Sequence, residues 1–587
     1  MRFFSRRYGK SFIRIAAVCL LSAMLCGCAQ NSNPLPAETA VLPPARLSFE
    51  APVGQMDAQR ETTVQLYLPS PDGTRLMAVT RRITVDPYRH HADELVNALF
   101  AYDGEEAQTL PRANNLTLLT PIEVSSGIAT VNLSAQALNL SHEELYVVFQ
   151  SVTNTLCSCA SIESVNLLIA GVQPGLDVSS ETPAGALHLN HTDDMTTLWS
   201  RALSQRNAAD GTRRLTQNVT LYFPAAGGMG ILCENRTLAF SQITLPHMAS
   251  VLLDALSEGP KVLFGVPTCP PLGSFLTTEP AVNEVSGERV LTLHFAENFG
   301  SALLEKGITR SCMAAALTYT LTTYLPGIAG VEMYIGQEKV QSVTPEGTYQ
   351  GAGETIYFQN GVMRRQQFSF FLLSQVKLYF ALENGMLQKV YRAVPWYEAP
   401  NAYSLLLELI RGPQYYDAGS RDVSAVMPLY AAMGDVLGVS HASPNTALVN
   451  FTARFHDLCR DMTPREEQLM VYAMVNTLTE LEGVWDVCFF VNGTQPDHFA
   501  STVSLPGVFM RNPDITATSL FSAKSDIAVS PSSQTRPILP NKRSKTYVSF
   551  HYPAGRRHGH LPLGKNGGQA ARMALQHALS RSGQAGP

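Results

Sequence analysis

Charged residues are scarce in this chain, and the motifs of several common catalytic sites are missing. Only 16% of the 587 residues are Asp, Glu, Lys or Arg, whereas 45% are hydrophobic. This balance excludes general disorder and allows packed cores. The sequence contains no nucleophile elbow, no P-loop and no dinucleotide-binding glycine fingerprint. We therefore expect a protein that is not an enzyme and that holds neither a cofactor nor a metal ion.

Charge is also unevenly distributed along the chain. Residues 1–37 carry five basic residues and no acid, and residues 515–587 carry ten Lys or Arg against one Asp. When these +5 and +9 charges are subtracted from the net charge of −5, the middle of the chain is left with −19. Such an acidic middle would repel nucleic acid, whose binding depends on phosphate neutralisation. We expect no nucleic-acid partner.

The first residues have the order of an export signal. Five basic residues precede the apolar stretch IAAVCLLSAML, which is too short to span a bilayer comfortably, and LCGC follows. The order Leu25, Cys26, Gly27, Cys28 resembles a bacterial lipobox, in which the cysteine is acylated and the preceding peptide is removed. We predict a lipoprotein signal peptide over 1–27, lipidation at Cys28 and a lipidated tether over 28–60. The alternative is an ordinary signal peptide with incidental cysteines.

Three nearly identical stretches divide the acidic middle: VQLYLP at 64–69, VTLYFP at 219–224 and VKLYFA at 376–381. A second strand pattern follows each one, at 75–85, 229–240 and 386–396. A helix pattern then places apolar or small residues on one stripe, beginning at Ala92, Met248 and Ala402. Gly104, Gly259-Pro260 and Gly412-Pro413 mark the ends of these helices.

The second half of each unit repeats as well. A hairpin pattern (122–134, 283–296, 436–452) precedes a helix that contains NTL, YTL or NTL (154–156, 319–321, 476–478), and a last strand follows (164–171, 330–336, 486–493). Each unit is predicted to be ββ-α-ββ-α-β, an α+β fold with two helices on one face of a mostly antiparallel sheet. Alternation in the strands indicates one covered and one wetter face. We place three tandem domains at 61–176, 215–345 and 373–500, and a basic, mostly disordered tail at 515–587.

The candidate reactive residues all have a structural interpretation. Glu143-Glu144 and Glu466-Glu467 open the second helix, where Ser141 and Thr463 predict capping boxes rather than an acid and a base. His90 and His91 have no counterpart in the other repeats, so we expect a surface loop rather than a metal pair. The cysteines after Cys28 are odd in number and are interpreted as buried small apolar residues rather than a disulfide framework, namely Cys157, Cys159, Cys233, Cys269, Cys312, Cys459 and Cys488.

One aromatic residue recurs in all three opening strands. Tyr67, Tyr222 and Tyr379 lie opposite the Leu66/Leu68 face and its equivalents. Two interpretations stay open: each tyrosine braces the rim of its sheet, or these sheet faces stack against neighbouring modules.

These motifs resemble the GerMN domain family of sporulation and spore germination lipoproteins. The resemblance rests on the LYF opening strand, the helix ending in EGP or RGP, the VNLS/LHFA/VNFT strand and the passage YTL…PGIAGVEMYIG, and it covers most of 61–500. The family's familiar arrangement has two such domains, and this chain has a third. The related domains are similar to the ring-building modules of channel complexes between mother cell and forespore.

The resemblance implies a non-catalytic lipoprotein on the outer face of the cell membrane of a spore-forming, Gram-positive cell. Its partners would be the membrane, through the lipid anchor, and other envelope or sporulation proteins that it assembles into a complex. The alternative is a protein that binds the cell wall or a polysaccharide, with peptidoglycan as a partner, or an accessory factor of a wall hydrolase.

Overall fold

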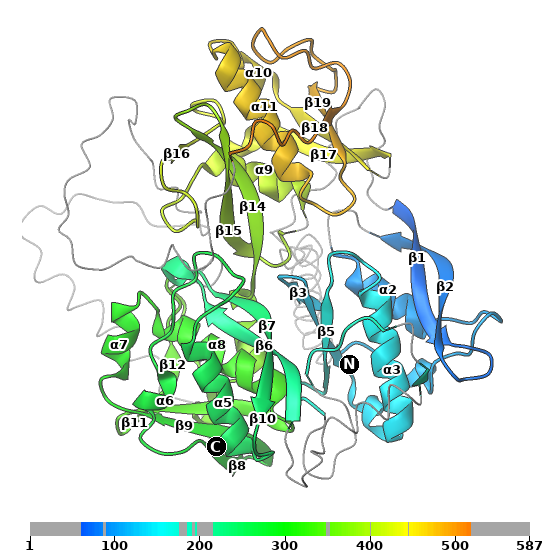
Figure 1. Cartoon of the computed structure of the whole chain (residues 1–587), viewed down its shortest axis with the longest axis vertical. Coiled ribbons are helices and arrows are strands. Elements are labelled where there is room, and N and C mark those ends of the chain that lie inside the picture. The colour runs from blue at the N-terminus through cyan, green and yellow to red at the C-terminus, as the bar shows by residue number, and fades with distance from the viewer. Residues whose placement is uncertain are drawn as a thin grey trace, which may run out of the picture. The chain divides into compact units, whose positions relative to one another are not determined.

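The computed structural model describes residues 60–85, 90–174, 185–190, 194–195, 215–347, 353–399, 401–443 and 445–517 (Figure 1). Cys28, the predicted signal peptide and the predicted tether up to residue 59 lie outside these residues. The predicted tail lies outside them from residue 518 onward.

Three copies of one element order follow each other along the described chain. The first copy consists of β1 (Arg60–Pro69), β2 (Leu76–Val85), α2 (Ala92–Phe100), β3 (Glu123–Ser125), β4 (Ile128–Leu133), α3 (His142–Leu156) and β5 (Ser164–Ile169). The second consists of β6 (Leu215–Pro224), β7 (Ile231–Phe240), α5 (Leu245–Ser257), β8 (Ala281–Val285), β9 (Glu288–Phe295), α8 (Arg310–Tyr324) and β10 (Ile328–Ile335). The third consists of β14 (Leu373–Leu382), β15 (Leu387–Pro395), α9 (Ala402–Arg411), β17 (Val436–Ser443), β18 (Thr446–Phe451), α11 (Pro464–Leu478) and β19 (Asp486–Val491). The predicted α+β fold of three tandem repeats is confirmed.

The strands of each repeat form two separate pieces. The opening strands pair as a long antiparallel hairpin, and the later strands form a second sheet in which β4, β9 and β18 pair antiparallel to the strand before them and parallel to β5, β10 and β19. The parallel pair follows from the intervening helix, which carries the chain back across the sheet. Short helices α7 (Phe299–Glu305) and α10 (Ala453–Cys459) precede the long helix in the second and third repeats.

The long second helix of each repeat joins the two pieces. Helix α3 packs on β1 and β5, α8 on β6 and β10, and α11 on β14 and β19. The Tyr67 N–H donates to Thr155 Oγ1 at 2.9 Å, and the Tyr222 N–H donates to Thr320 Oγ1 at 3.0 Å. In the first and second repeats, the threonine of the NTL/YTL motif therefore ties the helix to the backbone of the opening strand.

Each repeat has its own hydrophobic core, and two of these cores extend beyond the repeated pattern. Phe358, Phe368 and Phe371, which follow β10, belong to the core of the second repeat. Leu505 and Ile515 belong to the core of the third. There β20 (Phe509–Met510) pairs with β19, so the third repeat continues past residue 500, where the sequence pattern ends.

The expected wetter sheet face is wrong for the first repeat, since every residue of β5 is buried. The opening hairpin of the second repeat covers this sheet: Asn166 Nδ2 donates to Thr220 Oγ1 at 2.8 Å, and Asn235 Nδ2 donates to Ser164 Oγ at 2.6 Å. Periodicity within one repeat could not show that a neighbouring repeat would cover its outer face.

An arginine recurs at one register position of the hairpin and is buried in the last two repeats. Arg81, Arg236 and Arg392 pair across the strands with Val64, Val219 and Val376. In the last two repeats the guanidinium donates to the carbonyl of the glycine that ends the first helix, Gly259 or Gly412. The Arg236 and Arg392 side chains are 5% and 0% exposed, whereas that of Arg81 is 32% exposed.

The positive charge of Arg392 is neutralised by two buried carboxylates. It donates to Glu408 Oε2 at 2.6 Å, to Asp417 Oδ1 at 2.9 Å and to the Gly412 carbonyl at 2.7 Å. Burial alone would lower the pKa of Arg392, but the hydrogen bonds and charges of Asp417 and Glu408 raise it above its usual value.

We predict that Arg392→Met destabilises the chain by about 3–5 kcal/mol, because Asp417 would be left buried without a cation, whereas Glu408 keeps its ion pair with Arg411. Arg81→Met is the matched control at the equivalent position. Because the ion pair of Arg81 with Glu106 is solvent-exposed, its loss should cost about 0–1 kcal/mol. Urea unfolding of both variants checks the difference, and equal losses would contradict it.

Candidate functional site

One carboxylate of each pair at the second helices, Glu144 or Glu466, acts as a cap. Ser141 N–H donates to Glu144 Oε2 at 2.8 Å, and Glu144 N–H donates to Ser141 Oγ at 3.2 Å. Thr463 and Glu466 form the same reciprocal box. In the second repeat Thr309 accepts a hydrogen bond from Cys312 N–H, with no acid three residues later. The predicted capping boxes are confirmed.

Glu467, the other carboxylate of this pair, holds a loop instead, a role that the sequence did not indicate. This fully buried carboxylate accepts hydrogen bonds from the backbone N–H groups of five consecutive residues, Phe499 to Val503, at 2.8 to 3.2 Å. Burial alone would raise the pKa of Glu467, but these N–H donors lower it below its usual value. The side chain therefore fixes the loop that follows β19.

The two adjacent histidines lie in the turn before α2, so the predicted loop position is confirmed, but both side chains are half-buried rather than fully exposed. Burial, with a smaller effect of His91, lowers the pKa of His90 to about 4, and burial also lowers the pKa of His91. His90 Nε2 lies 3.1 Å from Ser161 Oγ, and His91 Nε2 lies 3.5 Å from Cys159 Sγ. Glu482 of the third repeat accepts hydrogen bonds from the Ala160 and Ser161 N–H groups of the same loop, at 2.8 and 3.0 Å.

The seven described cysteines carry free thiols, and six of them are buried; Cys157 is half-buried. Burial raises the pKa of Cys159, Cys233, Cys269 and Cys459 to about 12. A thiol with such a pKa is a poor nucleophile near neutral pH. The interpretation of these cysteines as small buried residues is confirmed.

The tyrosines of the opening strands are buried, with exposed fractions of 8% for Tyr67, 1% for Tyr222 and 2% for Tyr379. Tyr222 lies at a contact between repeats, as the stacking interpretation predicts. The Tyr379 hydroxyl instead donates to Glu480 Oε1 at 2.6 Å within its own repeat. The two interpretations therefore apply to different repeats.

Tyr222 belongs to a polar junction between the first repeat, the second repeat and the segment that follows β10, which we define by Glu123, Tyr222, Tyr319 and Arg365. The Tyr319 hydroxyl donates to Glu123 Oε1 at 3.1 Å, and Arg365 donates to Glu123 Oε2 at 2.8 Å. The guanidinium lies 3.9 Å above the Tyr319 ring, which is 5.0 Å from the ring of Tyr222. Glu123 comes from the first repeat, and Arg365 from the segment between β10 and β14.

Hydrogen bonds beside the polar junction bring in the third repeat. Ser125 Oγ of β3 donates to the Leu373 carbonyl of β14, and the Ser126 N–H donates to Ser374 Oγ at 3.3 Å. Cys233 Sγ of β7 lies 3.3 Å from Ser125 Oγ. Strands β3, β7 and β14 therefore meet at this point.

Arg365 and Tyr319 in the polar junction each keep one protonation state near neutral pH. Burial alone would lower the pKa of Arg365, but Tyr222, Glu123 and Tyr319 raise it above its usual value. Burial, with Glu123 nearby, raises the pKa of Tyr319 well above its usual value. The arginine is thus charged and the phenol neutral over the ordinary pH range. This arrangement can hold the first repeat to the second and to the segment that follows it, but Arg365 and Tyr319 are not poised to exchange a proton near neutral pH.

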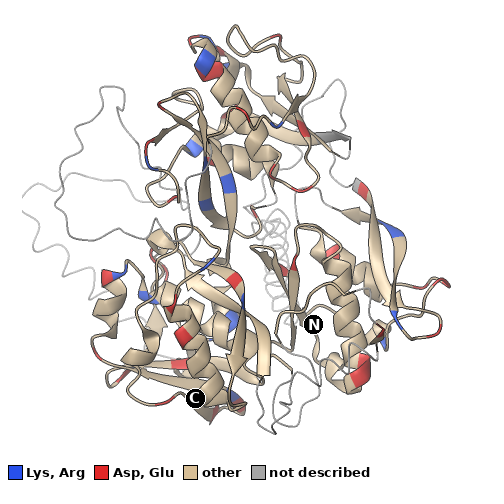
Figure 2. Ribbon diagram, viewed as in Figure 1, with Lys and Arg blue, Asp and Glu red and all other residues tan. Residues whose placement is uncertain are grey.

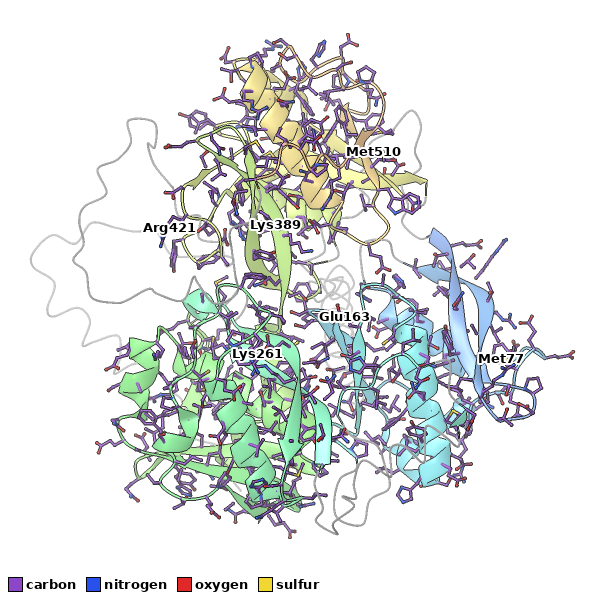
Figure 3. The ribbon with its side chains drawn as sticks, viewed as in Figure 1. Met77, Glu163, Lys261, Lys389, Arg421 and Met510 are labelled. Carbon is purple, nitrogen blue, oxygen red and sulfur yellow. The ribbon has the colours of Figure 1, made fainter. Side chains whose placement is uncertain are left out.

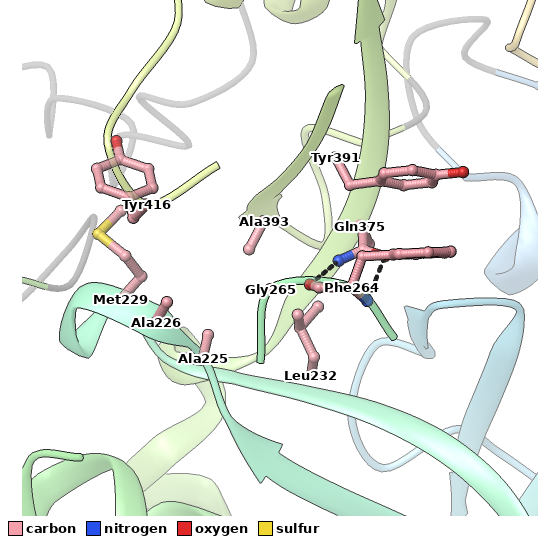
Figure 4. Close-up of a pocket in the computed structure, with 10 residues that line it drawn as sticks. All are labelled: Ala225, Ala226, Met229, Leu232, Phe264, Gly265, Gln375, Tyr391, Ala393 and Tyr416. Carbon is pink, nitrogen blue, oxygen red and sulfur yellow. Dashed lines mark hydrogen bonds between the residues drawn. The ribbon is translucent and has the colours of Figure 1, made fainter. Parts of the chain in front are cut away.

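A shallow pocket lies between the second and third repeats (Figure 4). Its lining includes Met229, Leu232, Ala393 and Tyr416, and Phe264 stacks on Tyr391 at one side with 4.1 Å between ring centroids. A free volume of about 10 Å³ has room for about one water molecule. The pocket is too small for a substrate.

Two kinds of feature, a metal site and a membrane-spanning helix, are absent from the residues that the structure describes. No group of three or more His, Cys, Asp or Glu side chains among them is placed to hold a metal ion. Within the same part of the chain, no helix combines the length and the apolar character needed to cross a membrane.

Comparison with known proteins gives a family match in the first and third repeats. The family model described as sporulation and spore germination (Germane) matches residues 65–174 and 377–497. The second repeat lies between the matched segments and has the same element order. No curated protein gives a significant match to the chain.

Solved structures of tandem domains are also similar. The tandem GerMN domains of the sporulation protein GerM from Bacillus subtilis are 17% identical, with 52% of this chain and 99% of that chain covered and a TM-score of 0.20. The first GerMN domain of the same protein is 20% identical, with 24% and 98% covered and a TM-score of 0.19.

We predict that Glu467→Gln destabilises the third repeat by on the order of 3 kcal/mol, because five backbone donors lose a charged acceptor. Backbone amide hydrogen exchange at residues 499–503 should also be faster in this variant than in the parent chain. Glu466→Ala, which removes only the adjacent capping carboxylate, should cost about 1 kcal/mol and leave that loop protected. Unchanged exchange in the Glu467 variant would show that the loop is held by other contacts.

A pH effect is expected from Glu398, between β15 and α9. Burial and the nearby Glu408 raise the pKa of Glu398 from 4.5 to about 8, against the opposite effect of Arg411. A carboxyl with a raised pKa in the folded state stabilises it fully below pH 4.5, and this stabilisation is lost as the pH rises through 8. Glu398→Gln should therefore increase the unfolding free energy, relative to the parent chain, more at pH 9 than at pH 4. Parallel pH profiles in urea unfolding would contradict this assignment.

Proposed function

We propose that the chain, whose first and third repeats match the GerMN (Germane) family of sporulation and spore germination proteins, is a membrane-anchored, non-catalytic lipoprotein. It acts in sporulation by assembling or stabilising an envelope protein complex between mother cell and forespore. The family match to the first and third repeats supports the sporulation part of this proposal.

The polar junction is the observation that carries an assembly role. Its polar groups form hydrogen bonds with one another, namely those of Glu123, Arg365, Tyr222 and Tyr319, and so connect the first repeat with the second and with the segment after β10. A protein built in this way presents composite outer surfaces, and several weak contacts on such surfaces add up when the protein is confined to a membrane.

The proposal that the chain is not an enzyme is supported by its carboxylates and thiols. Glu144 and Glu466 cap helices, Glu467 holds a loop, and the described thiols have high pKa values where a shift is seen. A second candidate function, binding to the cell wall or a polysaccharide, is favoured by the basic and aromatic outer face of the β14–β15 hairpin.

Anchoring is tested by Cys28→Ala in the native host. If diacylglycerol is attached at Cys28, the variant should move from the membrane fraction to the soluble extracellular fraction, because the anchor supplies the membrane affinity. Cys26→Ala, two residues earlier in the lipobox, is the matched control and should stay in the membrane. A Cys28→Ala chain that sediments with membranes, or release by the control alone, would overturn the anchor.

The assembly role is tested in the same strains. A deletion strain should sporulate poorly, and the parent sequence should restore sporulation whereas Cys28→Ala should not. Normal sporulation of the deletion strain would contradict the proposed role.

A further inference from the structure

The outer face of the β14–β15 hairpin corresponds to a docking face in the second repeat. There, the cross-strand partners Thr220 and Asn235 contact Asn166 and Ser164 of the first repeat. The equivalent partners in the third repeat are Lys377 and Tyr391, because the opening strands align at VTLYFP and VKLYFA. The next pair in the same direction is Tyr379 with Lys389.

Basic side chains at these positions are peculiar to the third repeat. Basic residues are drawn in blue on this hairpin in Figure 2, and Lys389 is labelled in Figure 3. The four positions carry no cation in the other two repeats, where the residues are Gln65, Tyr67, Ala78 and Thr80, and Thr220, Tyr222, Cys233 and Asn235. The fold therefore does not require lysines here.

The cations of this face outnumber the carboxylate that they share. Glu480 accepts hydrogen bonds from Lys377 Nζ at 3.0 Å and from the Tyr379 hydroxyl at 2.6 Å. It also lies 2.6 Å from an Arg511 nitrogen and 3.8 Å from Lys389 Nζ. Three cations around one carboxylate leave an excess of two positive charges, and the side chains of Lys377, Arg511 and Lys389 are 44%, 38% and 27% exposed.

An aromatic ring is fixed beside these charges. Gln375 Nε2 donates to the Phe264 carbonyl at 2.8 Å, and the Phe264 N–H donates to Gln375 Oε1 at 3.3 Å. Phe264 is thereby held against the partly exposed ring of Tyr391, with an interplanar angle of 14° (Figure 4). The negative face of an aromatic ring attracts partially positive C–H groups, such as those on the flat side of a sugar ring.

We propose that this face, defined by Lys377, Lys389, Tyr391 and Arg511, binds an acidic glycan, that is, a polysaccharide carrying carboxylates. The sugar ring stacks on Tyr391, and its carboxylate pairs with the lysines. The acidic middle of the chain repels polyanions elsewhere, so a local excess of positive charge is needed for such a contact.

A flat protein surface fits this face less well. The docking face of the second repeat buries short neutral side chains, whereas burying two lysines would cost their hydration and side-chain entropy. A hydrated glycan can approach the ammonium groups without burying them. This binding function is additional to membrane anchoring and does not depend on Cys28.

The test measures binding of the purified chain to polygalacturonate, with neutral dextran and poly-L-glutamate as comparison probes. Polygalacturonate should bind, dextran should not, and 0.5 M salt should weaken the binding because exposed charges are screened. The double variant Lys377→Gln/Lys389→Gln should weaken it at least roughly tenfold. Glu480→Gln, which removes the competing carboxylate, should tighten it, an effect opposite to that of structural damage.

Tyr391→Leu separates a glycan from a plain anion, since it should weaken binding of polygalacturonate but not that of poly-L-glutamate. Arg460→Gln is the matched charge control, because Arg460 is an exposed cation of the same repeat outside this face, and it should leave binding unchanged. The proposal is overturned if polygalacturonate does not bind, if the Arg460 and lysine variants behave alike, or if poly-L-glutamate binds equally well and Tyr391→Leu changes neither probe. The last result would point to an acidic peptide partner. Cys28→Ala should leave glycan binding intact, so the anchor and this site can fail separately.

Discussion

The contact between Arg365 and Glu123 is the interaction on which the arrangement of the repeats depends. A buried ion pair contributes little net stability, since desolvation offsets much of the attraction, but leaving either charge without its partner is costly. The Glu123 side chain of the first repeat must therefore meet an arginine that follows the second repeat, against the rings of Tyr222 and Tyr319. A hydrophobic contact could slide or rotate at smaller cost. The pair therefore limits how the first repeat can be oriented against the second, and this orientation decides which faces of the two repeats point outward.

The repeats share one scaffold but differ on the outer face of the opening hairpin. Each repeat keeps the Thr-containing helix, and the hairpin arginine reaches the end of the first helix in the second and third repeats. The outer face of the hairpin differs: it carries short polar residues where the second repeat meets the first, and lysines with tyrosines in the third. Function in such a family is therefore carried by surface positions, whereas the recurring letters encode the fold.

The sequence predicted the fold well because its signals are local. Apolar stripes, helix-ending glycines and the capping boxes at Ser141 and Thr463 depend on residues a few positions apart, and they recur three times. The contacts between repeats were not predictable in this way. Glu123 and Arg365 are separated by 242 residues, and although Glu123 lies in the repeated hairpin pattern, Arg365 lies between the predicted domains, so no repeated motif pairs them. The hairpin arginines did leave a signal, since they occupy one register position in all three repeats, but an alignment of the units on their strands is needed to see it.

The position of Arg365 has a consequence for how the chain is made. Synthesis delivers the first repeat long before residue 365, and domains generally fold in the order in which they emerge. During that interval the carboxylate of Glu123 lacks its guanidinium, although the hydrogen bonds of Asn166 and Asn235 can already form between the first two repeats. The connecting segment then brings Arg365 together with Phe358, Phe368 and Phe371, so the junction and the core of the second repeat are completed late. A fragment that stops short of this segment lacks both.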